Sequence, residues 1–142
     1  MSKQIKIKVI TPEQIVCECE AEQVTLPVTD GEVTILPEHR SYIASLQVGE
    51  IIAKKGGEEK SIAVFGGFLE FENNTLTVLA DEADRAEDID IEKAEAAKQR
   101  AEDIKNKVIK TDETEYAHVA ATLEREMSRI KIAKKFLARK GL

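Results

Sequence analysis

At 142 residues with a formal net charge of −6, the chain is long enough for two small domains and too acidic for a general nucleic-acid binder. Tryptophan is absent and only 4% of the residues are aromatic, which argues further against a surface that stacks bases. No run of 18 apolar residues is present, so the sequence predicts no membrane-spanning helix. The first residues lack the features of a signal or transit peptide, and we expect a cytosolic or organelle-encoded protein.

The distribution of glycine and proline divides the chain. Every proline, and every glycine except Gly141, precedes residue 68. Near this point the hydrophobic period changes from two residues to about 3.5, which marks a change from strands to helices. The sequence therefore predicts a two-domain β + α fold: an antiparallel β-sandwich over residues 1–86 and an antiparallel helical hairpin over residues 87–142.

The first domain reads as eight or nine short strands. Ile5, Ile7 and Val9 alternate with lysines, as expected for a half-buried strand. Turn residues separate the runs, and this spacing predicts a sandwich or flattened barrel rather than a parallel sheet. The expected strands cover residues 5–9, 15–20, 23–26, 33–36, 42–46, 50–54, 61–65, 68–71 and 75–79.

Two features of this domain need interpretation. Gly66 and Gly67 interrupt an apolar run and predict a bulge or corner between two strands, the alternative being a backbone surface against which another chain packs closely. Cys17 and Cys19 are the only cysteines. A disulfide between them would be badly strained, and two thiolates cannot complete a zinc site, so we expect ordinary reduced cysteines.

The second domain reads as two helices joined by a short loop. Asp88 and Asp90 can cap a helix that runs to about residue 110, and Asp112 with Glu115 forms a capping box for the next. A short connection predicts antiparallel neighbours. The seam of the first helix is mostly alanine: Ala94, Ala97, Ala101, Ile104 and Val108. The apolar positions of the second are Tyr116, Ala120, Leu123, Met127, Ile130, Ala133 and Leu137.

The composition of these helices suggests a mobile and charged element. A buried alanine removes little apolar area from water, at about 25 cal/mol per Å², so we expect the hairpin to be weakly held and able to relocate. Between residues 125 and 140, seven basic residues accompany Glu126 as the only acid. Either an acidic partner or a solvated face explains this charge.

The sequence offers no candidate for catalysis. His39 and His118 have no Ser or Cys beside them in a nucleophile context, and neither a G-x-S-x-G motif nor a Gly-rich phosphate loop is present. We therefore expect no active site and no metal site.

Several sequence blocks together resemble the epsilon subunit of F-type ATP synthase. They are VTLP at 24–27, DGEVTILPEH at 30–39, VFGGFLE at 64–70, LTVLAD at 76–81 and ADRAEDID at 83–90. The resemblance covers nearly the whole chain in the same order, with one departure at Arg40 and Ser41, where the family often has Ala-Pro.

This resemblance implies a non-catalytic central-stalk (rotor) subunit that couples ion flow to ATP synthesis. The sandwich would contact the gamma subunit and the ring of c subunits, with the turn containing Glu32 and His39 facing the ring. The hairpin would lie folded on the sandwich or extend along gamma toward the alpha and beta subunits, where it restrains ATP hydrolysis. The basic residues with this inhibitory role would be Arg125, Arg129, Lys131, Lys134, Lys135 and Arg139. The subunit would be peripheral, on the cytoplasmic face of the cell membrane or on a thylakoid membrane, and would meet the membrane only through the complex.

Some bacterial members of the family bind ATP through an Ile/Leu-Asp-x-x-Arg-Ala motif, and ATP is therefore a candidate regulatory ligand, although no cofactor is required. Here the segment is IDIEKA at 89–94, where Lys93 replaces arginine and loses its planar fork. The alternative is that Asp90 only caps the helix. The residues implied by the resemblance are Asp84, Asp90, Lys93, Arg100, Arg125 and Arg129.

A different function also remains open. The chain could be a free-standing adaptor or ATP-sensing module that binds an acidic partner through its basic terminal helix.

Overall fold

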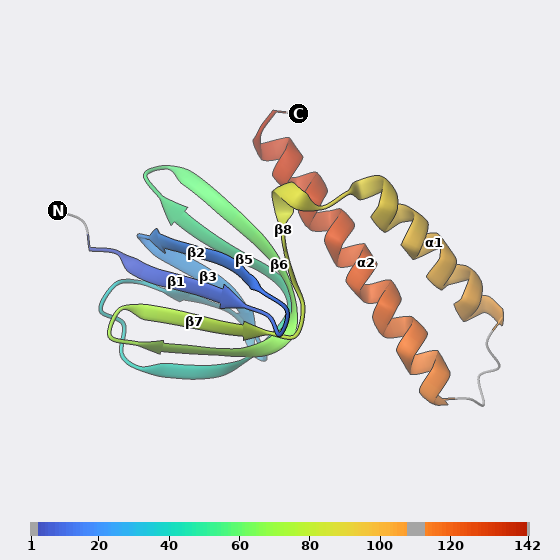
Figure 1. The fold of residues 1–142 in the computed structure, drawn as a ribbon, viewed down its shortest axis with the longest axis horizontal. Coiled ribbons are helices and arrows are strands. Elements are labelled where there is room, and N and C mark those ends of the chain that lie inside the picture. Colours follow the sequence, from blue (N-terminus) through green and yellow to red (C-terminus); the bar gives the residue numbers. More distant parts are fainter. Residues whose placement is uncertain (1–2, 108–112, 142) are drawn as a thin grey trace. The chain divides into compact units, whose positions relative to one another are not determined.

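The structure is a computed structural model that describes residues 3–107 and 113–141. The chain divides into two compact units, Met1–Ala86 and Glu87–Leu142, and each is described by itself. The first consists of strands and the second of two helices, as Figure 1 shows. The predicted fold class, a β-sandwich followed by a helical hairpin, is confirmed.

The described part of the first unit contains eight strands. Seven of them are hydrogen-bonded in the order β2-β1-β7-β6-β5-β3-β4, and β8 pairs with β6 beyond the end of β7. The strands are β1 (Ile5–Ile10), β2 (Ile15–Ala21), β3 (Gln23–Val28), β4 (Gly31–Ile35), β5 (Tyr42–Lys55), β6 (Glu58–Glu72), β7 (Thr75–Ala80) and β8 (Ala83–Arg85).

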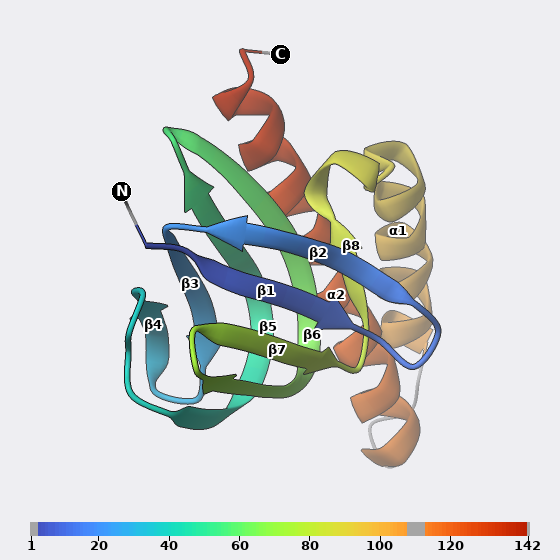
Figure 2. The same cartoon turned by 60° about the vertical axis from the view of Figure 1, so that its left-hand side comes forward.

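Strands β5 and β6 give the sheet its two layers. They span 14 and 15 residues and curve along their length, so that β1, β2 and β7 lie over β3 and β5 (Figure 2). The pairs are antiparallel as predicted, except that β1 and β7 run parallel. A parallel pair needs a long connection, and here the strands between β1 and β7 supply it.

Two of these strands were each wrongly predicted as two shorter strands. Residues 42–46 and 50–54 belong to one strand, β5, and residues 61–65 and 68–71 belong to β6. The register between them keeps one alignment from Tyr42, opposite Phe71, to Lys55, opposite Glu58. Strand β8, only three residues long, was not predicted.

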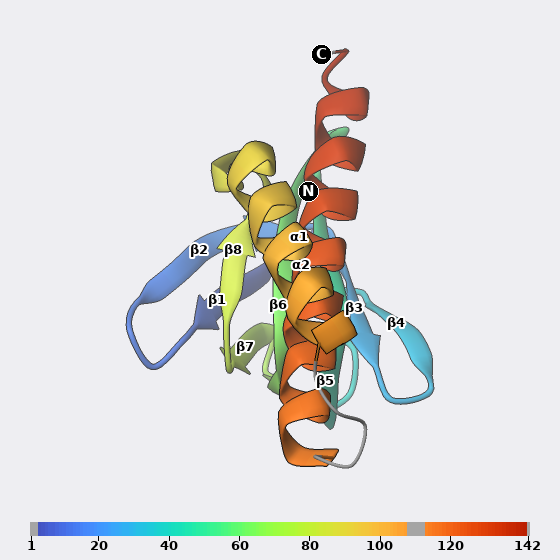
Figure 3. The same cartoon turned by 90° about the vertical axis from the view of Figure 1, so that its right-hand side faces the viewer.

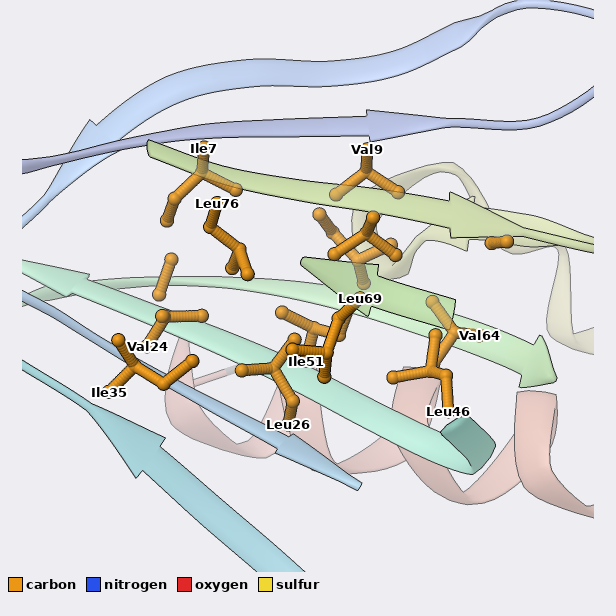
Figure 4. Packing of buried hydrophobic residues seen from close by; sticks show 14 of the residues in the cluster. Ile7, Val9, Val24, Leu26, Ile35, Leu46, Ile51, Val64, Leu69 and Leu76 are labelled. Atoms are coloured by element: carbon orange, nitrogen blue, oxygen red, sulfur yellow. The ribbon is translucent and has the colours of Figure 1, made fainter. Parts of the chain in front are cut away.

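The core of the sandwich lies between its layers, as Figure 4 shows. Ile5, Ile7 and Val9 are at most 2% exposed, so the predicted alternation in the first strand is confirmed. Residues from all the larger strands meet them there. The most completely buried large side chains are Phe71, Ile5, Ile7, Leu26, Ile35, Ile51, Leu69, Leu76, Val9, Val24, Val64 and Val78.

The second unit contains two antiparallel helices that lie side by side (Figure 3). A short 3₁₀ turn, Ala86–Asp88, precedes α1 (Ile91–Lys107), and α2 covers Glu113–Arg139. Ala94 and Ala101 are buried, which agrees with the predicted alanine seam. Val108 and Asp112, expected in the seam and in the capping box, lie outside the described residues.

Part of the predicted seam is wrong. Ile104 is 47% exposed and Met127 is 51% exposed, whereas Val119 and Ile132, which the pattern did not select, are buried. Apolar residues occupy more than one stripe of α2, and periodicity alone does not say which stripe is covered.

Candidate docking surfaces and ligand residues

One candidate surface lies where the β6–β7 hairpin meets the residues after β4. Asn73 and Asn74, both with positive φ, form the turn of this hairpin. The Asn74 side-chain oxygen accepts a hydrogen bond from the backbone N–H of Glu38, a residue also held at positive φ (68°). The Glu38 carboxylate pairs with Lys3. These contacts hold together the segment before β1, the residues after β4 and the β6–β7 hairpin.

His39 completes this surface. Its ring packs against Tyr42 and edge-on against Phe71, with centroid distances of 5.9 and 5.8 Å. Its Nδ1 donates a hydrogen bond to the Arg40 carbonyl at 2.7 Å. The ring is therefore oriented by its neighbours while the residue stays partly exposed.

Glu32 lies on a different element. It is the second residue of β4, exposed, and opposite Pro27 of β3. His39 follows the end of β4 and a separate turn, closed by the bond from His39 N–H to the Leu36 carbonyl at 3.1 Å. The expectation that one turn carries both residues is wrong, because a strand runs between them.

The second candidate surface is a row of apolar side chains on the outer face of the sheet. Five adjacent strands, from β5 through β6, β7 and β1 to β2, each place one residue directly opposite the next. These residues are Ser45, Phe68, Leu79, Ile10 and Ile15, all apolar except Ser45. Residues directly opposite in a sheet point to the same face. Phe68, Leu79 and Ile15 are 61%, 55% and 53% exposed. The strand path can be followed in Figure 2.

Ile43 extends this row. It lies two residues before Ser45, on the same face of β5, and is 74% exposed. We call Ile10, Ile15, Ile43, Phe68 and Leu79 the apolar row. Contiguous exposed apolar side chains of this kind mark interaction surfaces more often than scattered ones do. Sequence reasoning did not single out the row; the available signal was a second apolar residue beside a buried one, as in Phe68-Leu69 and Val78-Leu79.

The Gly66-Gly67 segment is an uninterrupted part of β6. Both residues have positive φ, 86° and 125°, but the register of β6 with β5 does not shift there, so the predicted bulge is absent. The Gly66 carbonyl accepts a hydrogen bond from the Asp81 N–H at 3.1 Å, at the bend between β7 and β8. The space beside Gly67 is taken by the backbone of Leu79 and Ala80. The close packing that this glycine permits is thus within the chain.

The residues implied for ATP binding are distributed over both units. Asp84 is in β8, and Asp90 precedes α1. The Asp90 carboxylate accepts a hydrogen bond from Lys93 N–H at 3.1 Å. Asp90 therefore caps α1, as the sequence predicted. Lys93 and Arg100 are exposed and lie seven residues apart, on one face of the helix.

The two remaining arginines of that set are partly buried on α2. Arg125 donates to the Thr122 hydroxyl at 3.3 Å. Arg129 pairs with Glu126 at 2.6 Å, and both side chains are little exposed, at 14% and 13%. A ligand that uses the Arg129 guanidinium must share it with this carboxylate.

The other basic residues of α2 are largely exposed. Lys134 reaches Glu95 of α1 at 3.5 Å, an exposed ion pair between the helices. Lys131, Lys135 and Arg139 are also exposed. Surface pairs of this kind contribute about 0–1 kcal/mol each, so the hairpin is not strongly fixed by them.

Two findings on residues 3–107 and 113–141 concern other classes of site. No helix among them is long and apolar enough to cross a membrane. No group of three or more His, Cys, Asp or Glu side chains there could hold a metal ion.

Comparison with known proteins agrees with the division into two units. Residues 4–86 match the family model of the β-sandwich domain of the ATP synthase delta/epsilon chain. Residues 87–134 match the model of the long α-helix domain of the same chain.

Curated relatives match along nearly their whole length. The ATP synthase epsilon chain of Desulforamulus reducens is 41% identical over 133 residues, which covers 94% of this chain and 99% of the relative. The epsilon chains of Dehalococcoides mccartyi and Bacillus velezensis are 43% and 38% identical, over 93% and 92% of this chain and 94% and 98% of theirs.

A solved structure shares the fold. A chain of the mitochondrial ATP synthase of Euglena gracilis, determined with OSCP, F1 and the c-ring, superposes with a TM-score of 0.74 at 21% identity, covering 88% of this chain and 78% of that one. The two domain matches and the relatives lead to one conclusion: the chain belongs to the ATP synthase delta/epsilon family, among the epsilon chains.

Proposed function

We propose that this chain is a non-catalytic central-stalk subunit of an F-type ATP synthase, which couples ion flow through the c ring to ATP synthesis together with gamma. Family membership supports the proposal, and the apolar row carries it. The row gives the sandwich an exposed apolar surface, and a partner that covers it would remove Phe68, Leu79, Ile15 and Ile43 from water. We assign this surface to gamma.

The gamma assignment is tested by one substitution in the row. Phe68→Asp places a charge in the proposed interface, and we expect at least tenfold weaker binding to purified gamma, measured by calorimetry. Leu36→Asp is the matched control, since Leu36 is 53% exposed in the same unit but lies outside the row. Unchanged binding of the Phe68 variant would exclude the row as the gamma surface.

We assign the surface around Glu38 and His39 to the c ring. It is held by contacts from three segments, and its His39 ring is oriented by Tyr42 and Phe71. Through these contacts the subunit would be peripheral, on the cytoplasmic face of the membrane, where it meets the membrane only through the complex.

The hairpin would restrain ATP hydrolysis by the alpha and beta subunits. Its exposed basic side chains and its thin apolar packing support this role, because both favour a second position against an acidic partner. Deletion of residues 87–142 should raise ATP hydrolysis by the reconstituted complex without preventing assembly. An unchanged hydrolysis rate in a complex of normal composition would mean that the hairpin does not restrain hydrolysis.

ATP as a regulatory ligand is a separate proposal. The alignment of Lys93 and Arg100 on one face of α1 supports it, with Arg125 and Arg129 supplied by α2. Calorimetry should then detect ATP binding that Arg125→Ala removes. Asp90→Asn is the informative second variant, because its amide oxygen preserves the helix cap while the charge is lost. Absence of binding at millimolar ATP would end this proposal and leave Asp90 as a cap only.

A further inference from the structure

Cys17 and Cys19 form a pair of adjacent thiols on β2, an edge strand of the sheet. Their sulfur atoms are 3.5 Å apart and share one thiol hydrogen bond. They lie opposite Val9 and Ile7 of β1 and pack against the sandwich core, and each side chain is half-buried.

The geometry does not suit a disulfide. Residues two apart on a strand are separated by about 6.6 Å at Cα, near the upper limit for a disulfide, whose sulfurs must come within about 2.05 Å. Closing that bond would distort the pairing of β2 with β1. A single bridging atom requires less movement, since two sulfur bonds of about 2.3 Å place the sulfurs about 3.3 Å apart at an angle near 90° and about 4.6 Å apart at 180°. A pyramidal As(III) bridge therefore fits the present spacing, and a linear Cu(I) bridge needs the sulfurs to separate by about 1 Å.

Charges of both signs surround the pair. A hollow of about 620 Å³ beside it is lined by Cys19, by the cations Lys55 and Lys60 and by the carboxylates Glu18, Glu20 and Glu58. The hydrogen bond with Cys17 and then burial raise the pKa of Cys19, whereas the charges of Lys60 and Lys55 act in the opposite direction. Cys19 thus retains its proton until an ion displaces it, and the two lysines offset part of the negative charge that the thiolates and the neighbouring glutamates bring.

We propose that Cys17 and Cys19 bind one soft, thiophilic centre, Cu(I) or trivalent arsenic, through both sulfurs. Soft thiolate ligands favour such centres over harder ions. With Cu(I), two S–H bonds break, two S–Cu bonds form and two protons pass to solvent. With phenylarsine oxide, two As–S bonds replace the As–O double bond, and the oxygen leaves as water with both protons. No oxidation state changes in either reaction.

The test uses the full chain with both thiols reduced. Phenylarsine oxide should give one adduct per chain by intact mass, with loss of both titratable thiols. Cu(I), measured by competition with a chromogenic chelator, should bind one ion per monomer. Binding of either probe through both sulfurs supports the site, and the two arms identify which centre it takes.

Single-cysteine variants separate a two-sulfur site from reaction at one thiol. Cys17→Ala and Cys19→Ala should each weaken binding at least 100-fold while leaving the far-UV circular dichroism spectrum unchanged. Binding within threefold of the wild type in either variant, binding of neither probe, or an adduct that joins two chains would overturn the proposal.

A matched pair of substitutions tests the role of the lysines. Lys60→Gln should weaken Cu(I) binding about threefold, because it removes a nearby positive charge. Lys8→Gln is the control, since Lys8 lies opposite Glu18 on the other face of the β1–β2 pair and should have no effect. Equal effects of the two substitutions would contradict the electrostatic part of the proposal.

Discussion

Gly67 shows how a single residue limits this sandwich. Its φ is 125°, and a Cβ there would lie 2.2 Å from the Leu79 carbonyl oxygen and 2.8 Å from the Ala80 Cα. Both are backbone atoms of β7, which pairs with β6 at this point. They cannot move without disturbing the β6–β7 ladder.

We therefore expect Gly67→Ala to lower the free energy of unfolding by about 3 kcal/mol, measured by urea denaturation. Gly57→Ala is the control: its φ is also positive, at 82°, but nothing lies within 4 Å of the added methyl group. That variant should lose about 1 kcal/mol from backbone strain alone. Equal losses would mean that the contact with β7 is unimportant.

At the scale of elements, the sequence predicted the inward-facing residues of the first strand, but it misplaced the ends of the two longest strands. Gly49 lies between the expected strands 42–46 and 50–54, yet it is part of β5, where an added Cβ would meet the Pro27 side chain at 2.8 Å. Gly66 and Gly67 were interpreted as a bulge or corner between two strands, yet both lie within β6. In these positions glycine serves close approach and backbone curvature, and a sequence does not distinguish these uses from a turn.

The two candidate surfaces were also only partly predictable from the sequence. His39 was selected through the family resemblance, but Glu38 was not, because its links to Asn74 and Lys3 join segments more than 30 positions apart. The apolar row depends on the register of five strands, which includes the unexpected parallel pair β1–β7. Such a surface follows from tertiary pairing and not from the pattern of any one strand.

The helical hairpin yields a prediction at the same scale. Ala101 is buried in α1, whereas Ala96 on the same helix is exposed. Ala101→Leu should destabilise the hairpin by about 1–3 kcal/mol, because the larger side chain overfills a seam built for close approach. Ala96→Leu should change stability little, since leucine and alanine are both good helix formers. Unfolding followed by circular dichroism compares the two, and a stable Ala101 variant would show that the helices adjust freely.

Across the whole molecule, buried apolar side chains are unevenly divided. The described part of the hairpin contributes five, of which three are alanines: Ala94, Ala101, Val119, Ile132 and Ala133. The sandwich supplies all twelve of the most completely buried large side chains. Because stabilisation increases with the apolar area removed from water, the two units should differ in stability. This difference follows from the alanine seam and would let the second unit rearrange while the first remains folded.

Amide hydrogen exchange on the intact chain tests this difference. Amides of β1, β5, β6 and β7 should exchange only through global unfolding, whereas those of α1 and α2 should exchange at least 100-fold faster through local opening. Urea at concentrations below the unfolding midpoint should accelerate the hairpin amides less steeply than the strand amides, because local opening exposes less surface. Uniform protection across strands and helices would instead mean that the hairpin opens only with the sandwich. A hairpin that cannot open independently could not move between two positions, and the proposed restraint of ATP hydrolysis would then have to act from one fixed arrangement.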